Sequence, residues 1–107
     1  MLLNVTPTVV KLRFRAIAQA DLAEIDTFSA ERFGRDVADM YASGLIEAFS
    51  QIATFPRSAP ARTDYGLHIR SKVYRSHRII YVIDRHGDVE IYRVVHHSRD
   101  VPAALKP

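Results

Sequence analysis

The chain has 107 residues, which is enough for one hydrophobic core and too few for two, so we expect a single domain over residues 1–107. Its 48% hydrophobic and 25% charged content with a formal net charge of +3 indicates a globular protein, and the lack of cysteine excludes disulfides, thiolate metal sites and cysteine nucleophiles. No apolar run approaches the roughly 20 residues of a membrane span and no signal peptide is visible, which predicts a cytoplasmic protein without a membrane partner.

Charge is distributed unevenly along the chain. Residues 1–18 carry three bases and no acid, residues 19–56 carry seven acids and two bases, and residues 57–107 carry ten bases and five acids. All five histidines also lie in the last segment. This polarity predicts an anionic partner for the C-terminal half, either a nucleic acid or an acidic peptide. The alternative is a sheet face that is merely solvated by arginines.

The N-terminal part predicts a loose extension followed by a strand. Pro7 interrupts any regular structure in residues 1–8. From Val9 to Ala16 apolar and basic residues alternate, which is typical of a half-buried strand. Its apolar face consists of Val10, Leu12, Phe14 and Ala16.

Two amphipathic helices are predicted next. The first spans Ala18–Phe33, with Asp21 and Glu24 among the residues facing water, and with an apolar stripe of Ala18, Leu22, Ile25, Phe28 or Ser29, and Phe33. Gly34 fits its C-cap. The second spans Arg35–Thr54 and stops before Pro56, with a stripe of Val37, Met40, Tyr41, Gly44, Leu45, Ala48, Ile52 and Phe55. The short connection predicts an antiparallel hairpin, in which Gly44 marks a point of close packing.

The C-terminal half predicts three strands. A loop over 57–66 precedes a strand at Leu67–Tyr74, whose basic face carries His68, Arg70, Lys72 and Tyr74. Two further strands, His77–Asp84 and Val89–His97, form a β-hairpin whose turn includes Gly87, a residue that accepts positive φ at little cost. After Asp100 we expect only a frayed turn or tail over residues 101–107.

This order predicts an α+β fold. An N-terminal strand is followed by the antiparallel helical hairpin and then by a three-stranded antiparallel meander. The helices pack on one face of the sheet, and the other face stays partly open.

The stretch from Ser76 to Asp100 gathers side chains that could bind a target or cleave RNA. Cleavage through the 2′-hydroxyl needs a base, an acid and cations that stabilise the charged phosphorane. His77, His96 and His97 can act as acid or base. Candidate cations are Arg70, Lys72, Arg78, Arg93 and Arg99. Each histidine also has a plainer interpretation as a hydrogen-bonded structural residue.

Other chemistries are disfavoured. Neighbouring strand residues point to opposite faces, so we expect that His96 and His97 do not share a metal ion. The sequence has neither a G-x-S-x-G elbow nor a glycine-rich phosphate loop. We therefore expect no metal and no cofactor. Tyr41 and the helix phenylalanines are interpreted as core residues.

The order of several short motifs resembles the RelE/ParE superfamily of toxin–antitoxin toxins, and most of all its ParE branch. The resemblance covers residues 11–102 and rests on ADL.EI at 20–25, FG at 33–34, FP at 55–56, Arg62, IRS at 69–71, HRIIY at 77–81 and RVVHHSRD at 93–100. It implies a small α+β toxin that a co-expressed antitoxin holds inactive. ParE-like members poison DNA gyrase, whereas RelE-like members cut mRNA in the ribosomal A site.

Within this resemblance, Arg78 matches a strand arginine that RelE-like toxins use on the scissile phosphate. The nuclease branch also relies on a late tyrosine, and residues 101–107 contain none. The leading hypothesis is therefore a toxin that binds gyrase directly. The alternatives are a ribosome-dependent mRNA endonuclease, which would use Arg78 with His77 or His96, and a non-toxic relative that still binds antitoxin.

The expected partners follow from the same resemblance. A cognate antitoxin of the ribbon-helix-helix type is expected to place a disordered, partly acidic segment on the basic sheet and on exposed apolar grooves. DNA is expected to be contacted only through that antitoxin. The candidate residues for binding target or antitoxin are Arg70, Lys72, His77, Arg78, Arg93, His96 and Arg99.

Overall fold

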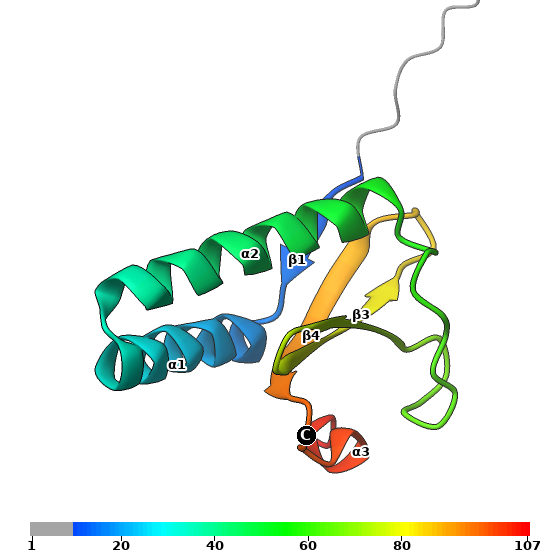
Figure 1. The fold of residues 1–107 in the computed structure, drawn as a ribbon. Helices are drawn as coiled ribbons and strands as arrows, with labels where there is room; N and C mark the ends of the chain where they lie inside the picture. The colour runs from blue at the N-terminus through cyan, green and yellow to red at the C-terminus, as the bar shows by residue number, and fades with distance from the viewer. Residues whose placement is uncertain (1–9) are drawn as a thin grey trace, which may run out of the picture.

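Helices and strands follow the predicted order (Figure 1). The structure, a computed structural model, describes residues 10–107, so the predicted extension over residues 1–8 and the predicted strand start at Val9 lie outside the described residues. The elements are β1 (Leu12–Phe14), α1 (Ala16–Phe33), α2 (Arg35–Thr54), β2 (Arg70–Tyr74), β3 (His77–Ile83), β4 (Val89–His96) and α3 (Val101–Ala104).

The four strands form one sheet in the order β1-β4-β3-β2. The meander β2-β3-β4 is antiparallel, as predicted, and β1 adds to β4 in parallel through pairs such as Leu12 with Val89. The first strand is shorter than predicted, because Ala16 already belongs to α1. The predicted α+β fold is confirmed.

The helical hairpin is also confirmed, with bounds within two residues of those predicted. Gly34 ends α1 with φ of 93°, a conformation that favours glycine, and its N–H donates to the carbonyl of Ala30 at 2.9 Å. Figure 1 shows α1 and α2 side by side, with the turn between them well away from the sheet.

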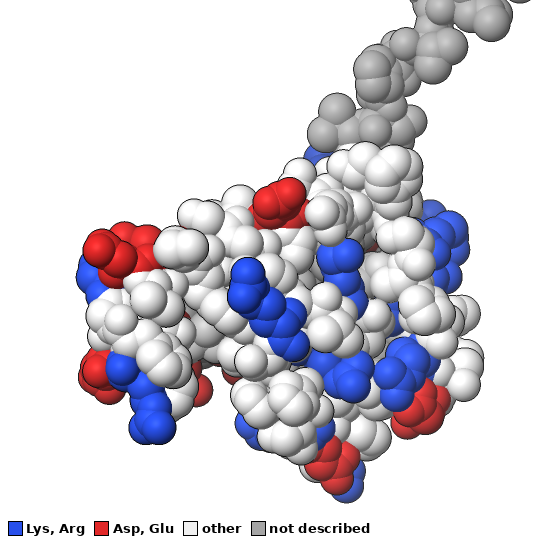
Figure 2. Space-filling view, in the orientation of Figure 1, with Lys and Arg blue, Asp and Glu red and all other residues white. Residues whose placement is uncertain are grey.

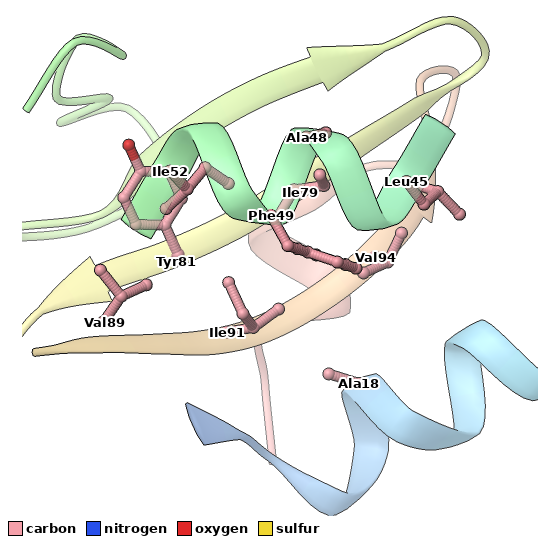
Figure 3. Close-up of a cluster of buried hydrophobic side chains, with 10 residues drawn as sticks. All are labelled: Ala18, Leu45, Ala48, Phe49, Ile52, Ile79, Tyr81, Val89, Ile91 and Val94. Carbon is pink, nitrogen blue, oxygen red and sulfur yellow. The ribbon is translucent and has the colours of Figure 1, made fainter. Parts of the chain in front are cut away.

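The main core lies between α2 and the face of the sheet that we call the inner face (Figure 3). Phe49 and Ile52 of α2 pack with Ile79 of β3 in this cluster, and Ala18 is the buried contribution of α1. Tyr81 is fully buried, and its hydroxyl donates to the carbonyl of Pro56 at 2.6 Å. That bond satisfies a buried phenol and fixes the chain where α2 ends.

The opposite side of the sheet, the outer face, carries a second and smaller cluster of Ile69, Ile80, Val95, Val101 and Ala104. Two of these residues belong to α3, so the prediction of a frayed tail was wrong. The carboxylate of Asp100 caps this short helix by accepting from the N–H of Ala103 at 3.3 Å. The apolar side chains of α3 are buried against β4, and the prediction of a tail did not include this packing.

One predicted boundary in the C-terminal half also needs correction. The strand predicted to start at Leu67 starts at Arg70, because His68 has φ of 62° and the chain turns there. Gly87 has φ of 81° in the β3–β4 turn, as predicted.

The residues of the predicted apolar stripes are buried only where the helices cover the sheet. Beyond it, Phe28 and Phe33 of α1 are 60% and 59% exposed, and Met40 of α2 is 74% exposed. The prediction that the helix phenylalanines are core is therefore correct for Phe49 and wrong for Phe28 and Phe33. The free end of the hairpin presents an apolar surface that the described chain does not bury.

Asp21 was predicted to face water, and this was wrong. Its carboxylate accepts from Nε and Nη2 of Arg93, both at 2.8 Å, and from the backbone N–H of Val94 at 2.9 Å. The side chains of Asp21 and Arg93 are only 10% and 11% exposed. Arg93 also donates through Nη1 to the carbonyl of Ala104 at 2.7 Å. One ion pair thus joins α1, β4 and α3.

The close approach of α2 to β2 at Gly44 gives the first prediction. A Cβ at this position would overlap with the phenol ring of Tyr74. Gly44→Ala should therefore lower the free energy of unfolding by about 1–3 kcal/mol, although alanine favours a helix by about 1 kcal/mol. Urea unfolding measures the change. Ser43→Ala, at an exposed neighbour, is the control and should stay within about 0.5 kcal/mol. A stabilised Gly44→Ala variant would contradict the close packing.

The buried ion pair gives the second prediction. Asp21→Asn should lower the free energy of unfolding by about 3 kcal/mol or more, because it leaves the Arg93 cation buried without its counter-charge. Asp26→Asn is the matched control, since Asp26 pairs with Arg35 on the exposed side of the same helix and should cost at most about 1 kcal/mol. Equal losses from the two variants, measured by urea unfolding, would refute the structural role of the pair.

Candidate functional site

A groove of about 540 Å³ lies between the helical hairpin and the ends of β3 and β4; we call it the hairpin groove. Its apolar wall comes from the exposed half of the hairpin and consists of Ile25, Phe28, Phe33 and Val37. Its polar end consists of Tyr41, Ser76, His77 and His96, and the acids Asp21 and Glu24 line it from α1. The volume is in the range of pockets that hold small ligands.

The strand register brings two of the predicted site residues together in this groove. His77 pairs with His96 across β3 and β4, and their ring centroids are 5.7 Å apart. The hydroxyl of Tyr41, from α2, lies 2.6 Å from Nδ1 of His77. Nδ1 of His96 lies 2.7 Å from the hydroxyl of Ser98. No local pattern marks Tyr41 as a site residue, because its partner is 36 residues away.

Burial influences the protonation of Tyr41 and His77. It lowers the pKa of His77, and the nearby His96 and His97 lower it further, while Asp21 acts in the opposite direction. Burial also raises the pKa of the Tyr41 phenol, which therefore keeps its proton at neutral pH. A neutral phenol can donate to Nδ1 when this nitrogen carries no proton, so the pair favours an uncharged His77.

The relation between His96 and His97 differs from the prediction. They were expected on opposite faces of a strand, yet β4 ends at His96 and the chain turns, so the two rings lie 4.4 Å apart between centroids. Within residues 10–107, no group of three His, Asp or Glu side chains has the arrangement of a metal site.

Arg78 lies on the other side of the sheet from the two histidines. It pairs with Val73 and Val95, and Val95 belongs to the cluster on the outer face. His77 and Ile79, its neighbours in β3, face the inner side. The three residues proposed for RNA cleavage therefore do not converge on one point.

Two other predicted cations form hydrogen bonds or ion pairs within the chain. Arg93 is bound to Asp21 and to the backbone of α3, as described above. Arg70 donates through Nη1 to the carbonyl of Ala59 at 2.5 Å and thereby holds the loop before β2. Lys72 is half-exposed on β2, and Arg99 is exposed in the turn after β4.

The uneven charge of the sequence corresponds to the two layers of the fold. The acidic segment, residues 19–56, contains nearly all of the helical hairpin, and the basic segments contain the strands. Figure 2 shows Lys and Arg side chains gathered over the sheet, while at the free end of the hairpin Asp and Glu side chains lie beside Lys or Arg side chains. The lining of the hairpin groove, within the described residues, includes no lysine and no arginine.

The helices of residues 10–107 are each too short or too polar to cross a lipid bilayer.

Comparison with known proteins identifies the family. Residues 12–101 match the sequence model described as the ParE toxin of type II toxin–antitoxin systems, parDE. The chain belongs to the ParE toxin family. Toxin ParE1 of Mycobacterium tuberculosis, in two strains, is 32% identical over 88 residues, which are 82% of this chain and 90% of that protein. The ParE-like resemblance predicted from the sequence is thus confirmed, and the chain is a type II toxin of the ParE family.

Solved structures of related systems agree with the fold. A chain from a chromosomal ParDE toxin–antitoxin system of P. aeruginosa matches with a TM-score of 0.72 at 14% identity, covering 82% of this chain and 96% of that one. A chain of the toxin–antitoxin complex RelBE2 of Mycobacterium tuberculosis matches with a TM-score of 0.58 at 25% identity, covering 84% and 100%. Both neighbours come from toxin–antitoxin systems, and both share the fold of this chain.

The lowered pKa of His77 gives a prediction on pH dependence. The folded state resists protonation of this ring, so the free energy of unfolding should fall as pH drops below the unfolded pKa of about 6.5 towards the lower folded value. His77→Asn, which keeps an acceptor near Nδ1, should flatten this dependence. Urea unfolding at pH 7.5 and pH 5 measures it, with His86→Asn in the exposed β3–β4 turn as control. An unchanged slope in His77→Asn would assign the dependence to other groups.

Proposed function

We propose that this ParE-family toxin inhibits DNA gyrase by direct protein contact in the cytoplasm and is neutralised by a cognate antitoxin. The observation that carries the proposal is the separation of Arg78 from His77 and His96 on opposite faces of the sheet. Phosphodiester cleavage needs the acid, base and cation within reach of one phosphate. Binding needs no such convergence. This reasoning agrees with the activity that the resemblance to ParE toxins implies.

The basic residues that remain accessible are the candidates for contact with gyrase or with an acidic antitoxin segment. They are Lys72, Arg78 and Arg99, together with the exposed His96 at the end of β4. Arg70 holds the loop before β2, and Arg93 holds α3, through hydrogen bonds within the chain. Both residues therefore affect binding through the shape of the surface. His77 contributes through its contact with Tyr41 in the hairpin groove.

The antitoxin in this proposal is of the ribbon-helix-helix type, and DNA is contacted only through it. Such a pair is expected to maintain plasmids or to restrain growth. An acidic segment that folds onto the basic sheet would be attracted over a distance of about 10 Å at 0.1 M salt, which speeds association. The rate of association should accordingly fall as ionic strength rises.

A supercoiling assay tests the gyrase target. The purified toxin should inhibit supercoiling by purified gyrase, and added antitoxin should restore it. The double variant Lys72→Ala/Arg78→Ala should need about ten-fold more protein for the same inhibition, because it removes accessible cations from both faces of the β2–β3 edge. Arg85→Ala, at an exposed cation in the β3–β4 turn, is the matched control and should behave as the unaltered toxin. Gyrase that is unaffected by the toxin would refute the proposal.

Two further measurements distinguish the alternatives. The similarity to the RelBE2 chain suggests one alternative, a ribosome-dependent endonuclease. It would place Arg78 on the scissile phosphate and use His77 or His96 as acid or base. Primer extension on translated mRNA would then reveal cuts at codons that depend on the toxin. A non-toxic relative that only binds antitoxin would leave viable cell counts unchanged when it is expressed alone.

A further inference from the structure

A second groove, of about 440 Å³, lies where α2 ends against the β3–β4 turn; we call it the α2-end groove. Its apolar wall consists of Phe55 and Pro56, which follow α2, and of Ile83 at the end of β3. Gly87 lines it from the β3–β4 turn. Phe55 is 66% exposed. An aromatic ring left in water beside two further apolar residues favours an apolar occupant.

The hydroxyl groups that line this groove already form hydrogen bonds within the chain. The hydroxyl of Thr54 donates to the carbonyl of Ser50 at 2.9 Å, and the hydroxyl of Ser58 donates to the carbonyl of Phe55 at 2.8 Å. Among the described residues that line the groove, Arg57 alone carries a charge. An occupant therefore gains more from apolar side chains than from polar ones.

The described chain begins next to this groove. β1 runs parallel to β4, so the chain before β1 comes from the side of the β3–β4 turn, which precedes β4. The backbone N–H of Lys11 donates to the carboxylate of Asp88 at 3.0 Å, and Asp88 directly follows Gly87 of the groove lining. Val10 packs against the main core, as Ile83 does. Figure 1 shows the blue start of the described chain at the same end of the molecule as the end of α2.

Residues 1–9 have the composition that the α2-end groove favours. They read MLLNVTPTV and contain no acidic or basic side chain. In an extended chain Leu3 and Val5 share one face and Asn4 points to the other, and Pro7 favours an extended conformation for the residue before it. Nine extended residues span about 30 Å. A tether this short gives an effective concentration on the order of mM, so that even a weak contact with the groove is populated.

We propose that the N-terminal segment, residues 1–9, docks on the α2-end groove of its own chain, with Leu3 and Val5 against Phe55 and Ile83. The docked segment covers the exposed ring of Phe55 and holds the end of α2 on the β3–β4 turn. This inference is independent of the proposed function, because it involves no other molecule. It replaces the loose extension expected from the sequence, since Pro7 disfavours a regular strand but allows an extended segment that packs through its side chains.

Urea unfolding of the full-length toxin tests the contact. Leu3→Asp should raise the equilibrium constant of unfolding by about ten-fold, because an apolar side chain is lost from the groove. Asn4→Asp is the matched control: it places the same charge on the opposite face of the segment and should stay within about two-fold. In a Phe55→Ala background, Leu3→Asp should have at most about a three-fold effect, because its main contact is already gone. Equal effects of Leu3→Asp in both backgrounds would overturn the inference.

Nuclear magnetic resonance provides a readout that does not depend on stability. Nuclear Overhauser contacts should join the methyl groups of Leu3 or Val5 to the ring of Phe55 in unaltered toxin. In an equal mixture of ¹³C-labelled and unlabelled toxin, these contacts should arise within one chain only. Contacts found only between labelled and unlabelled chains would place the segment on a second copy and overturn docking within the chain. The absence of any contact between the segment and the groove would overturn it as well.

Discussion

The buried ion pair between Asp21 and Arg93 is the interaction that fixes how the two layers meet. β1 covers only Val89–Ile91 of β4, and beyond that point the edge of β4 is capped by the carboxylate of Asp21, which accepts the N–H of Val94. Taking two charges out of water costs several kcal/mol per ion unless geometry and further hydrogen bonds compensate. Here the paired bonds from Arg93 and the backbone donor supply that compensation. The start of α1 is thereby held on the sheet, and α3 is held through Ala104.

Local patterns predicted the elements but could not predict this pair. The periods of 3.6 and 2 located both long helices and the three-stranded meander within a few residues, because those periods reflect burial on one face. Asp21 looks like any polar residue of an amphipathic helix, and its partner is 72 residues away. A bulge contributes as well: Ile80 pairs with Arg93 but Tyr81 pairs with Ile91, so Tyr92 is an extra residue in β4. Nothing in the sequence around Tyr92 indicates that extra residue.

The candidate site was predictable only in part, because strand alternation can be read from the sequence but strand register cannot. Strand alternation already places His77 and Arg78 on opposite faces, so their separation follows from the sequence alone. The juxtaposition of His77 with His96 requires the register of β3 and β4. The exposure of Phe28 and Phe33 could not be predicted, because periodicity shows which helix face is apolar but not how far the hairpin extends beyond the sheet. Figure 1 shows that it extends well beyond it.

That extension gives the toxin two surfaces of opposite character. The sheet layer is basic, while the free end of the hairpin is apolar and belongs to the acidic part of the chain. An antitoxin that covers both surfaces must carry acidic residues in one part and apolar residues in another. Ion pairs weaken as salt rises, whichever partner carries the positive charge, whereas the apolar contacts do not. High salt should therefore slow the association of the complex, while the apolar contacts keep its dissociation slow, so that the affinity declines about as much as the rate of association.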